Sequence, residues 1–178
     1  MNAYRNAWTP GDCVGLVVAL LVMTTAAVWG LDTNQTRATL RGLTGVHVMV
    51  EEISPEIKRA GLTTTQLQTD AELRLRKAGI RVLTQEESLA TPGGPYLYIR
   101  VTGLKDETVT GRPLGYAAFT EVSLHQNVRL ARDPAITAVG AQTWNSASRI
   151  WLVDSAKVRL IRESVADQVD EFINATWP

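Results

Sequence analysis

The chain has 178 residues, 45% of them hydrophobic and 20% charged, and its 18 basic and 18 acidic side chains leave no net charge. This composition is typical of a globular protein and excludes collagen-like, coiled-coil and disordered chains. A nucleic-acid binder normally carries a basic face, so we expect no nucleic acid among the partners. The chain contains one cysteine, Cys13, which excludes an internal disulfide.

An uncharged apolar segment over residues 14–29 lies near the start of the sequence. As a helix it would be about 24 Å long, slightly shorter than the roughly 30 Å hydrocarbon core of a bilayer. Its length and position are typical of a secretory signal, which a peptidase would cut after Ala27 or Gly30. Trp8 and Trp29 suit an uncleaved anchor instead, because indoles prefer the membrane interface. A soluble buried helix is a third alternative.

We therefore divide the chain into three parts. Residues 1–30 are expected to be a signal peptide or signal anchor, residues 31–43 a polar tether, and residues 44–178 a single α+β domain. The signal peptide and the anchor both place the domain outside the cytoplasm.

The first half of the domain is predicted to form a strand, a helix and a second strand. Residues 46–53 alternate apolar and polar side chains, as a strand does, and Ser54 and Pro55 break this pattern. A helix over residues 63–78 and a strand over 80–83 follow. The helix joins the two strands as a crossover, so we expect them to be parallel.

The helix over 63–78 has strong local signals. Thr63 and Gln66 have the spacing of a capping box at its start, and Gly79 supplies the left-handed residue after its end. Four residues form an apolar stripe along it, namely Leu67, Ala71, Leu75 and Ala78. The pairs Asp70–Arg74 and Glu72–Arg76 have the i,i+4 spacing of ion pairs on its polar side.

Three strands and a helix are predicted for the second half. The strands cover residues 96–104, 114–130 and 137–144, with a loop over 105–113, and the helix covers 155–176. In the first of these strands the side chains alternate, with Leu97, Ile99 and Val101 on one face and Tyr96, Tyr98 and Arg100 on the other. Strict alternation indicates antiparallel strands with one face in water.

These elements predict an α+β fold in the order β-α-β-β-β-β-α, preceded by an N-terminal hydrophobic helix. It is a two-layer sandwich of a mixed sheet of about five strands with two helices on one face, because those helices suffice to cover its apolar side.

No group of residues in the sequence points to catalysis. His47 and His125 lie in predicted strands, and two histidines without a third ligand make a poor zinc site. The G-x-S-x-G motif of a nucleophile elbow is absent, and Gly93-Gly94 precedes a strand rather than a helix, so it cannot form a phosphate loop. We therefore expect no enzyme, no catalytic residue, no metal and no cofactor. A small hydrolase using His125 is the third functional alternative.

The candidate contact surface consists of Tyr96, Tyr98 and Arg100, because exposed Tyr, Trp and Arg dominate binding hot spots. For Trp144, Trp151 and Trp177, core packing is the simpler interpretation and a partner surface the alternative.

Three pieces of the sequence, residues 67–80, 142–144 and 169–174, are similar to a group of small uncharacterised exported bacterial proteins over about residues 40–176. The order of elements also resembles envelope modules such as the amino-terminal domain of the Tol-Pal β-propeller protein and the auxiliary lipoproteins of ABC transporters. The lipid-attachment cysteine of those lipoproteins is missing here. The resemblance implies a domain in the periplasm, or one anchored in the inner membrane, and carries over no catalytic residue.

We thus expect a non-catalytic binding or scaffolding module at the bacterial cell envelope. Its expected partners are envelope proteins and, where the amino-terminal segment stays uncleaved, the membrane. The alternative is a small-ligand carrier or transport-accessory protein of the periplasm, with its pocket between the sheet and the helices.

Overall fold

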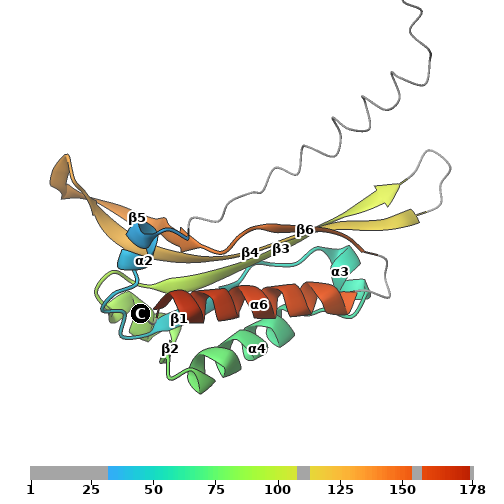
Figure 1. Ribbon diagram of the computed structural model, residues 1–178, viewed down its shortest axis with the longest axis horizontal. Helices are drawn as coiled ribbons and strands as arrows, with labels where there is room; N and C mark the ends of the chain where they lie inside the picture. Colours follow the sequence, from blue (N-terminus) through green and yellow to red (C-terminus); the bar gives the residue numbers. More distant parts are fainter. Residues whose placement is uncertain (1–31, 108–112, 154–157, 177–178) are drawn as a thin grey trace, which may run out of the picture.

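The computed structural model describes residues 32–107, 113–153 and 158–176, which form an α+β domain with a mixed sheet (Figure 1). The elements in chain order are α2 (Asn34–Ala38), β1 (Val46–Val50), α3 (Pro55–Arg59), α4 (Thr64–Lys77), β2 (Val82–Leu83), α5 (Gln85–Ala90), β3 (Tyr96–Glu107), β4 (Pro113–Leu130), β5 (Asp133–Asn145), β6 (Arg149–Val153) and α6 (Val158–Thr176). None of the helices among these residues combines the length and apolar character that crossing a membrane requires. The apolar segment 14–29 lies outside the described residues.

The strands follow the order β2-β1-β3-β4-β5, and β6 also pairs with β4. β1 is parallel to both β2 and β3, as predicted for β2, while the remaining pairs are antiparallel. Because β4 has 18 residues, its second half pairs with β5 and its first half with β6. β5 and β6 therefore follow one another along the same edge of the sheet.

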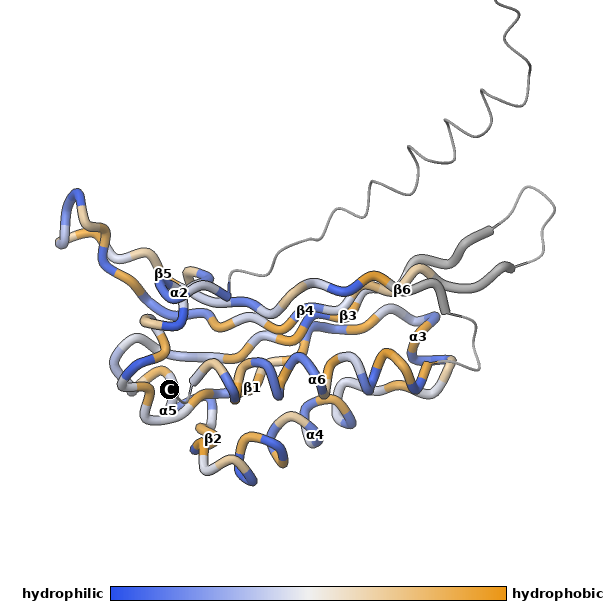
Figure 2. Tube along the Cα trace, viewed as in Figure 1, coloured by the Kyte–Doolittle hydropathy of each residue, from blue (hydrophilic) through white to orange (hydrophobic). Residues whose placement is uncertain are grey.

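Helices α4 and α6 lie side by side along one face of the sheet (Figure 1). Hydrophobic and hydrophilic residues alternate along β3 and β4 (Figure 2), so that one side of each strand faces the helices. The core between the layers includes Leu67, Ala71 and Leu75 of α4, Leu97, Ile99 and Val101 of β3, Val122 and Leu124 of β4, and Ile161, Val165, Val169 and Phe172 of α6. The predicted α+β class is confirmed.

The local signals of α4 are confirmed in detail. The Thr63 hydroxyl accepts from the N–H of Gln66 at 3.2 Å, and the Gln66 amide oxygen accepts from the N–H of Thr63 at 3.0 Å. At the other end, Gly79 has φ +80°, and the N–H of Ile80 donates to the carbonyl of Leu75 at 2.9 Å. Both ends of this helix are thus capped by residues next to it in sequence.

One of the two predicted ion pairs on α4 is wrong. Glu72 and Arg76 do pair, at 2.8 Å. Asp70 instead accepts two bonds from Arg162 of α6, at 2.5 and 2.8 Å, while Arg74 pairs with Asp170 at 2.6 Å. The packing of α6 beside α4 supplies a guanidinium that reaches both oxygens of Asp70, and a fork of this kind is stronger than a single contact.

Four short elements were not predicted, namely α2, α3, α5 and β6. Pro55 does not simply break the first strand but begins α3, because proline suits the first position of a helix. Thr84 and Glu87 form a capping box that begins α5. Residues 105–107 continue β3 instead of entering the loop, and β6 follows the bend after β5.

Residues 32–43, which we predicted to be a polar tether, dock on the domain. Leu40 is only 2% exposed and belongs to the core. Asp32 accepts bonds from both Arg37 and the indole N–H of Trp144, the latter at 3.1 Å. Gln126 of β4 donates to the carbonyl of Thr39 at 3.2 Å. The polar composition of this segment reflects its outer side, while one leucine anchors its inner side.

The docked segment predicts a stability effect at Leu40. We expect Leu40→Ala to lower the free energy of unfolding by about 3 kcal/mol, because it leaves a cavity in the core. Leu89→Ala is the matched control, since Leu89 is 76% exposed and its loss should cost less than about 0.5 kcal/mol. Urea denaturation measures both values. Equal effects of the two substitutions would contradict the docking of this segment.

The ion pair between α4 and α6 predicts a pH dependence. The hydrogen bond from Arg162 is the main reason that the pKa of Asp70 lies below its ordinary value of 3.8. The pair therefore stabilises the fold above that pH and loses its contribution as the pH falls through the lowered pKa. A double-mutant cycle of Asp70→Asn and Arg162→Gln should give a coupling of about 0.2–1 kcal/mol at pH 7 that disappears at strongly acidic pH. A coupling that persists in acid would exclude this ion pair as its source.

Candidate functional site

Tyr96, Tyr98 and Arg100 lie on the face of β3 that points away from α4 and α6, as predicted. The residues between them, Leu97 and Ile99, are fully buried in the core. Because successive strand side chains point to opposite faces, this burial places the two tyrosines and the arginine on the open face. Tyr96 and Tyr98 are half-buried there, and the Arg100 side chain is 45% exposed.

The pairing of β3 with β4 brings His125 between the two tyrosines. Its backbone lies opposite Tyr96, and the two rings stack with centroids 5.1 Å apart and an interplanar angle of 16°. Tyr98 meets the same imidazole edge-on at 5.5 Å. We call Tyr96, Tyr98, Arg100 and His125 the tyrosine patch. The predicted contact surface did not include His125, because the register of β3 on β4 is a long-range property.

Both ring nitrogens of His125 have partners. Nδ1 lies 3.0 Å from the carbonyl oxygen of Gly140, which can only accept, so Nδ1 carries a proton. Nε2 lies 3.0 Å from the hydroxyl of Ser123. These two contacts fix the orientation of the ring.

Arg100 is held beside the rings by a carboxylate. Its Nε donates to Glu51 at 2.9 Å, and its guanidinium carbon lies 5.7 Å from the centroid of the Tyr98 ring. Burial, followed by the nearby charge of Glu51, raises the pKa of Tyr98 above its ordinary value of 10.0. The phenol therefore keeps its proton at neutral pH and remains a hydrogen-bond donor.

Gly140 of β5 lies beneath Tyr96 and has φ +63°, a conformation that favours glycine. A Cβ atom at this position would lie 3.0 Å from the Tyr96 hydroxyl oxygen. The glycine thus allows the backbone of β5 to approach the ring while its carbonyl holds His125.

Apolar side chains extend the open face beyond the tyrosine patch. Met49 of β1, which pairs with Tyr98, is 39% exposed. At the other side, Phe119 of β4 pairs with Ile150 of β6, whose exposed fraction is 68%. The open face therefore combines aromatic, apolar and charged groups.

The other candidate residues lie apart from the tyrosine patch or in the core. Tyr96 pairs with His47 on one side and His125 on the other, so β3 separates the two histidines. The described part of the chain contains no group of three residues able to hold a metal ion. Trp144 is fully buried against Phe172, which confirms the core interpretation for this residue. The Trp151 side chain and Trp177 lie outside what the structure describes.

No model of a known protein family matches the chain, and no curated protein matches it either. The described residues form an α+β domain with an aromatic and arginine patch on the face of its sheet opposite α4 and α6.

The close approach at Gly140 predicts a change in the patch. We expect Gly140→Ala to destabilise the chain by about 1–2 kcal/mol and to displace Tyr96 from His125, because the methyl group adds a contact to the backbone strain. Gly42→Ala is a matched control, since Gly42 has φ +79° and no neighbour within 4 Å of its Cβ position. NMR of the His125 ring should change in the first variant alone. Identical spectra in both variants would contradict the contact.

Proposed function

We propose that this chain is a non-catalytic binding or scaffolding module, and that the tyrosine patch contacts another protein at the bacterial cell envelope. The observation that carries the proposal is the packing of His125 between Tyr96 and Tyr98 on the face of the sheet opposite α4 and α6. A hot spot made of Tyr and Arg gives large contact area from few side chains.

The order within the patch supports a binding role. Association costs free energy wherever it immobilises side chains, and long polar side chains cost the most. Here the imidazole is fixed by two hydrogen bonds and Arg100 by Glu51. Much of the ordering thus precedes binding, so more of the contact energy remains for affinity.

The surroundings indicate the chemistry of the partner. Met49 and Ile150 offer apolar area on either side, while Arg100 offers guanidinium N–H groups beyond the one that Glu51 accepts. A complementary protein surface would present apolar side chains together with a carbonyl or carboxylate oxygen opposite Arg100.

Two features of the sequence support a location at the envelope. The apolar segment 14–29 suits a signal peptide or an anchor, and both place the domain outside the cytoplasm. The resemblance to small exported bacterial proteins points to the same compartment. Partners are therefore envelope proteins, joined by the membrane where the segment stays uncleaved.

The contact surface is tested by site-specific photocrosslinking in the native host. With the photoreactive residue at Thr102, beside Arg100 on the open face, we expect a crosslinked partner whose yield falls at least about tenfold in Tyr98→Ala and Arg100→Ala variants. A photoreactive residue at Leu73, on the exposed side of α4, serves as the control and should not capture this partner. Unchanged yield in both alanine variants would overturn the assignment of the patch.

The location is tested by labelling a single thiol. A Cys13→Ser, Leu89→Cys chain carries its only cysteine at an exposed position of α5. In spheroplasts and the released periplasm, we expect a membrane-impermeant maleimide to label it, whether or not the amino-terminal segment is cut. The same variant without residues 1–30 should stay unlabelled inside intact cells. Protection of the longer chain would exclude export. The intact mass of the labelled product separates a chain cut after Ala27 or Gly30 from an uncleaved one.

A further inference from the structure

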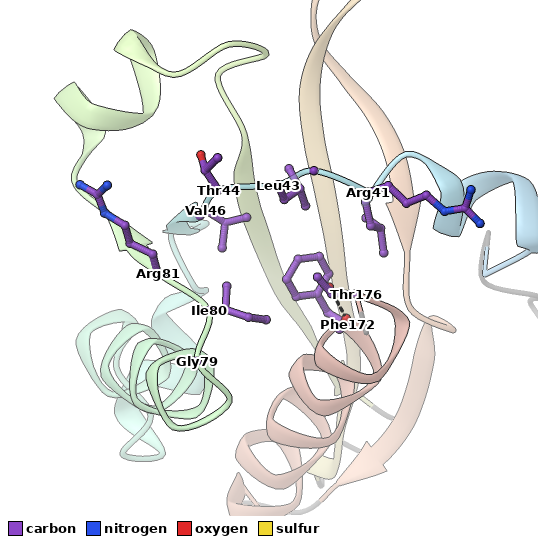
Figure 3. A pocket seen from close by; sticks show the side chains of 12 residues that line it. Arg41, Leu43, Thr44, Val46, Gly79, Ile80, Arg81, Phe172 and Thr176 are labelled. Atoms are coloured by element: carbon purple, nitrogen blue, oxygen red, sulfur yellow. Dashed lines mark hydrogen bonds between the residues drawn. The ribbon is translucent and has the colours of Figure 1, made fainter. Parts of the chain in front are cut away.

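A cavity of about 410 Å³ opens at the end of the sandwich where α4 and α6 both end (Figure 3). Its size falls within the range of small-molecule sites, about 300–1,000 Å³. The lining comes from the segment before β1, the turn after α4 and the last turns of α6; it consists of Leu40, Arg41, Gly42, Leu43, Thr44, Gly45, Val46, Gly79, Ile80, Arg81, Phe172 and Thr176.

The inner part of this cavity is apolar. Leu43, Val46, Ile80 and Phe172 project toward the same space from three different segments (Figure 3). Val46 and Phe172 also belong to the core, so among the described residues the cavity continues the core. Such a surface binds an apolar body in preference to a polar one.

The charged part of the lining has one sign. Arg41 and Arg81 extend outward on opposite sides of the opening (Figure 3), and none of the described residues that line the cavity is acidic. The guanidinium of Arg81 forms an ion pair with the carboxylate of Glu87, with 2.5 Å between nitrogen and oxygen. No described residue forms an ion pair with Arg41. The opening therefore favours an anionic group, and Arg41 is the cation available to it.

Helix ends do not cancel this preference. The carboxyl ends of helices carry partial negative charge on carbonyls without partners. The turn after α4 satisfies its carbonyls through the N–H groups of Gly79 and Ile80. At the end of α6, the Thr176 hydroxyl donates to the carbonyl of Phe172 at 2.8 Å. Arg41 and Arg81 are the charged side chains among the described lining residues.

We propose that this cavity binds a small amphiphile with an apolar body and a single carboxylate, of the class of medium-chain fatty acids. The apolar chain lies between Leu43, Ile80 and Phe172, and the carboxylate reaches Arg41 at the opening. The site lies on the helix side of the sheet, so this inference stands independently of the tyrosine patch.

Equilibrium dialysis of the full chain with radiolabelled octanoate tests the site. If the chain is recovered uncleaved, it is held in lipid nanodiscs, and empty nanodiscs serve as the blank. We expect one saturable site. Octanol, which has the same apolar body without the carboxylate, should bind at least about fivefold more weakly, and Arg41→Gln should weaken octanoate binding by a similar factor. Arg59→Gln, an exposed arginine of α3 outside the cavity, is the matched control and should bind like the natural chain.

A variant that fills the cavity provides the second arm. Leu43→Trp adds an aromatic ring at the lining and should abolish octanoate binding, while thermal unfolding shows that the variant is folded. Absence of saturable binding to the natural chain, or equal affinity for octanol and octanoate, would overturn the proposal. Trp177 directly follows the lining residue Thr176 in sequence. If octanoate bound only to the Trp177→Ala variant, the cavity would be the binding place of the chain's own tryptophan. That result would also overturn the proposal.

Discussion

The two-sided character of β3 is the constraint on which both the core and the tyrosine patch depend. β3 lies between a parallel neighbour, β1, and an antiparallel one, β4. Burial of Leu97, Ile99 and Val101 under the helices fixes its orientation, because a shift of one residue would move all three into water. The same burial directs Tyr96, Tyr98 and Arg100 to the open face. The residues that hold the fold together therefore also determine which side chains a partner can reach.

The sequence predicted those parts of the structure whose signals are local. The caps of α4 lie within a few residues of its ends, and the faces of β3 follow from alternation alone, so both were correct. Contacts between distant segments could not be predicted this way. The stacking of Tyr96 on His125 depends on strand register, and the exchange of Arg74 for Arg162 beside Asp70 depends on the packing of α6. The capping box of Thr84 and Glu87 was visible in the sequence, but the helix that it begins, α5, was not predicted. α5 is only six residues long.

The docked segment 32–43 connects features that the sequence analysis treated separately. Its Asp32 bonds Trp144 in the core, its Thr39 accepts from Gln126 of β4, and its Leu40 lines the cavity. Polar composition alone suggested a tether, because most of the segment faces water. A single buried leucine and two residues that hydrogen-bond to the domain, Asp32 and Thr39, are enough to hold such a segment. Leu40 and the three residues that follow it also line the cavity, so the docking of this segment shapes one wall of it.

This docking also limits where the domain can lie if the apolar segment 14–29 remains as an anchor. Only three peptide steps separate Trp29, at the end of that segment, from Asp32, which is held on the domain. An extended chain spans at most about 3.5 Å per residue, so the link covers roughly 10 Å. A domain tied this closely stays beside the headgroups, and its open face meets proteins at the membrane surface rather than far from it. After cleavage at Ala27 or Gly30 the docked segment would remain on the domain, and the domain would be free to diffuse. An uncleaved and a cleaved amino terminus therefore differ in how far the domain can lie from the membrane.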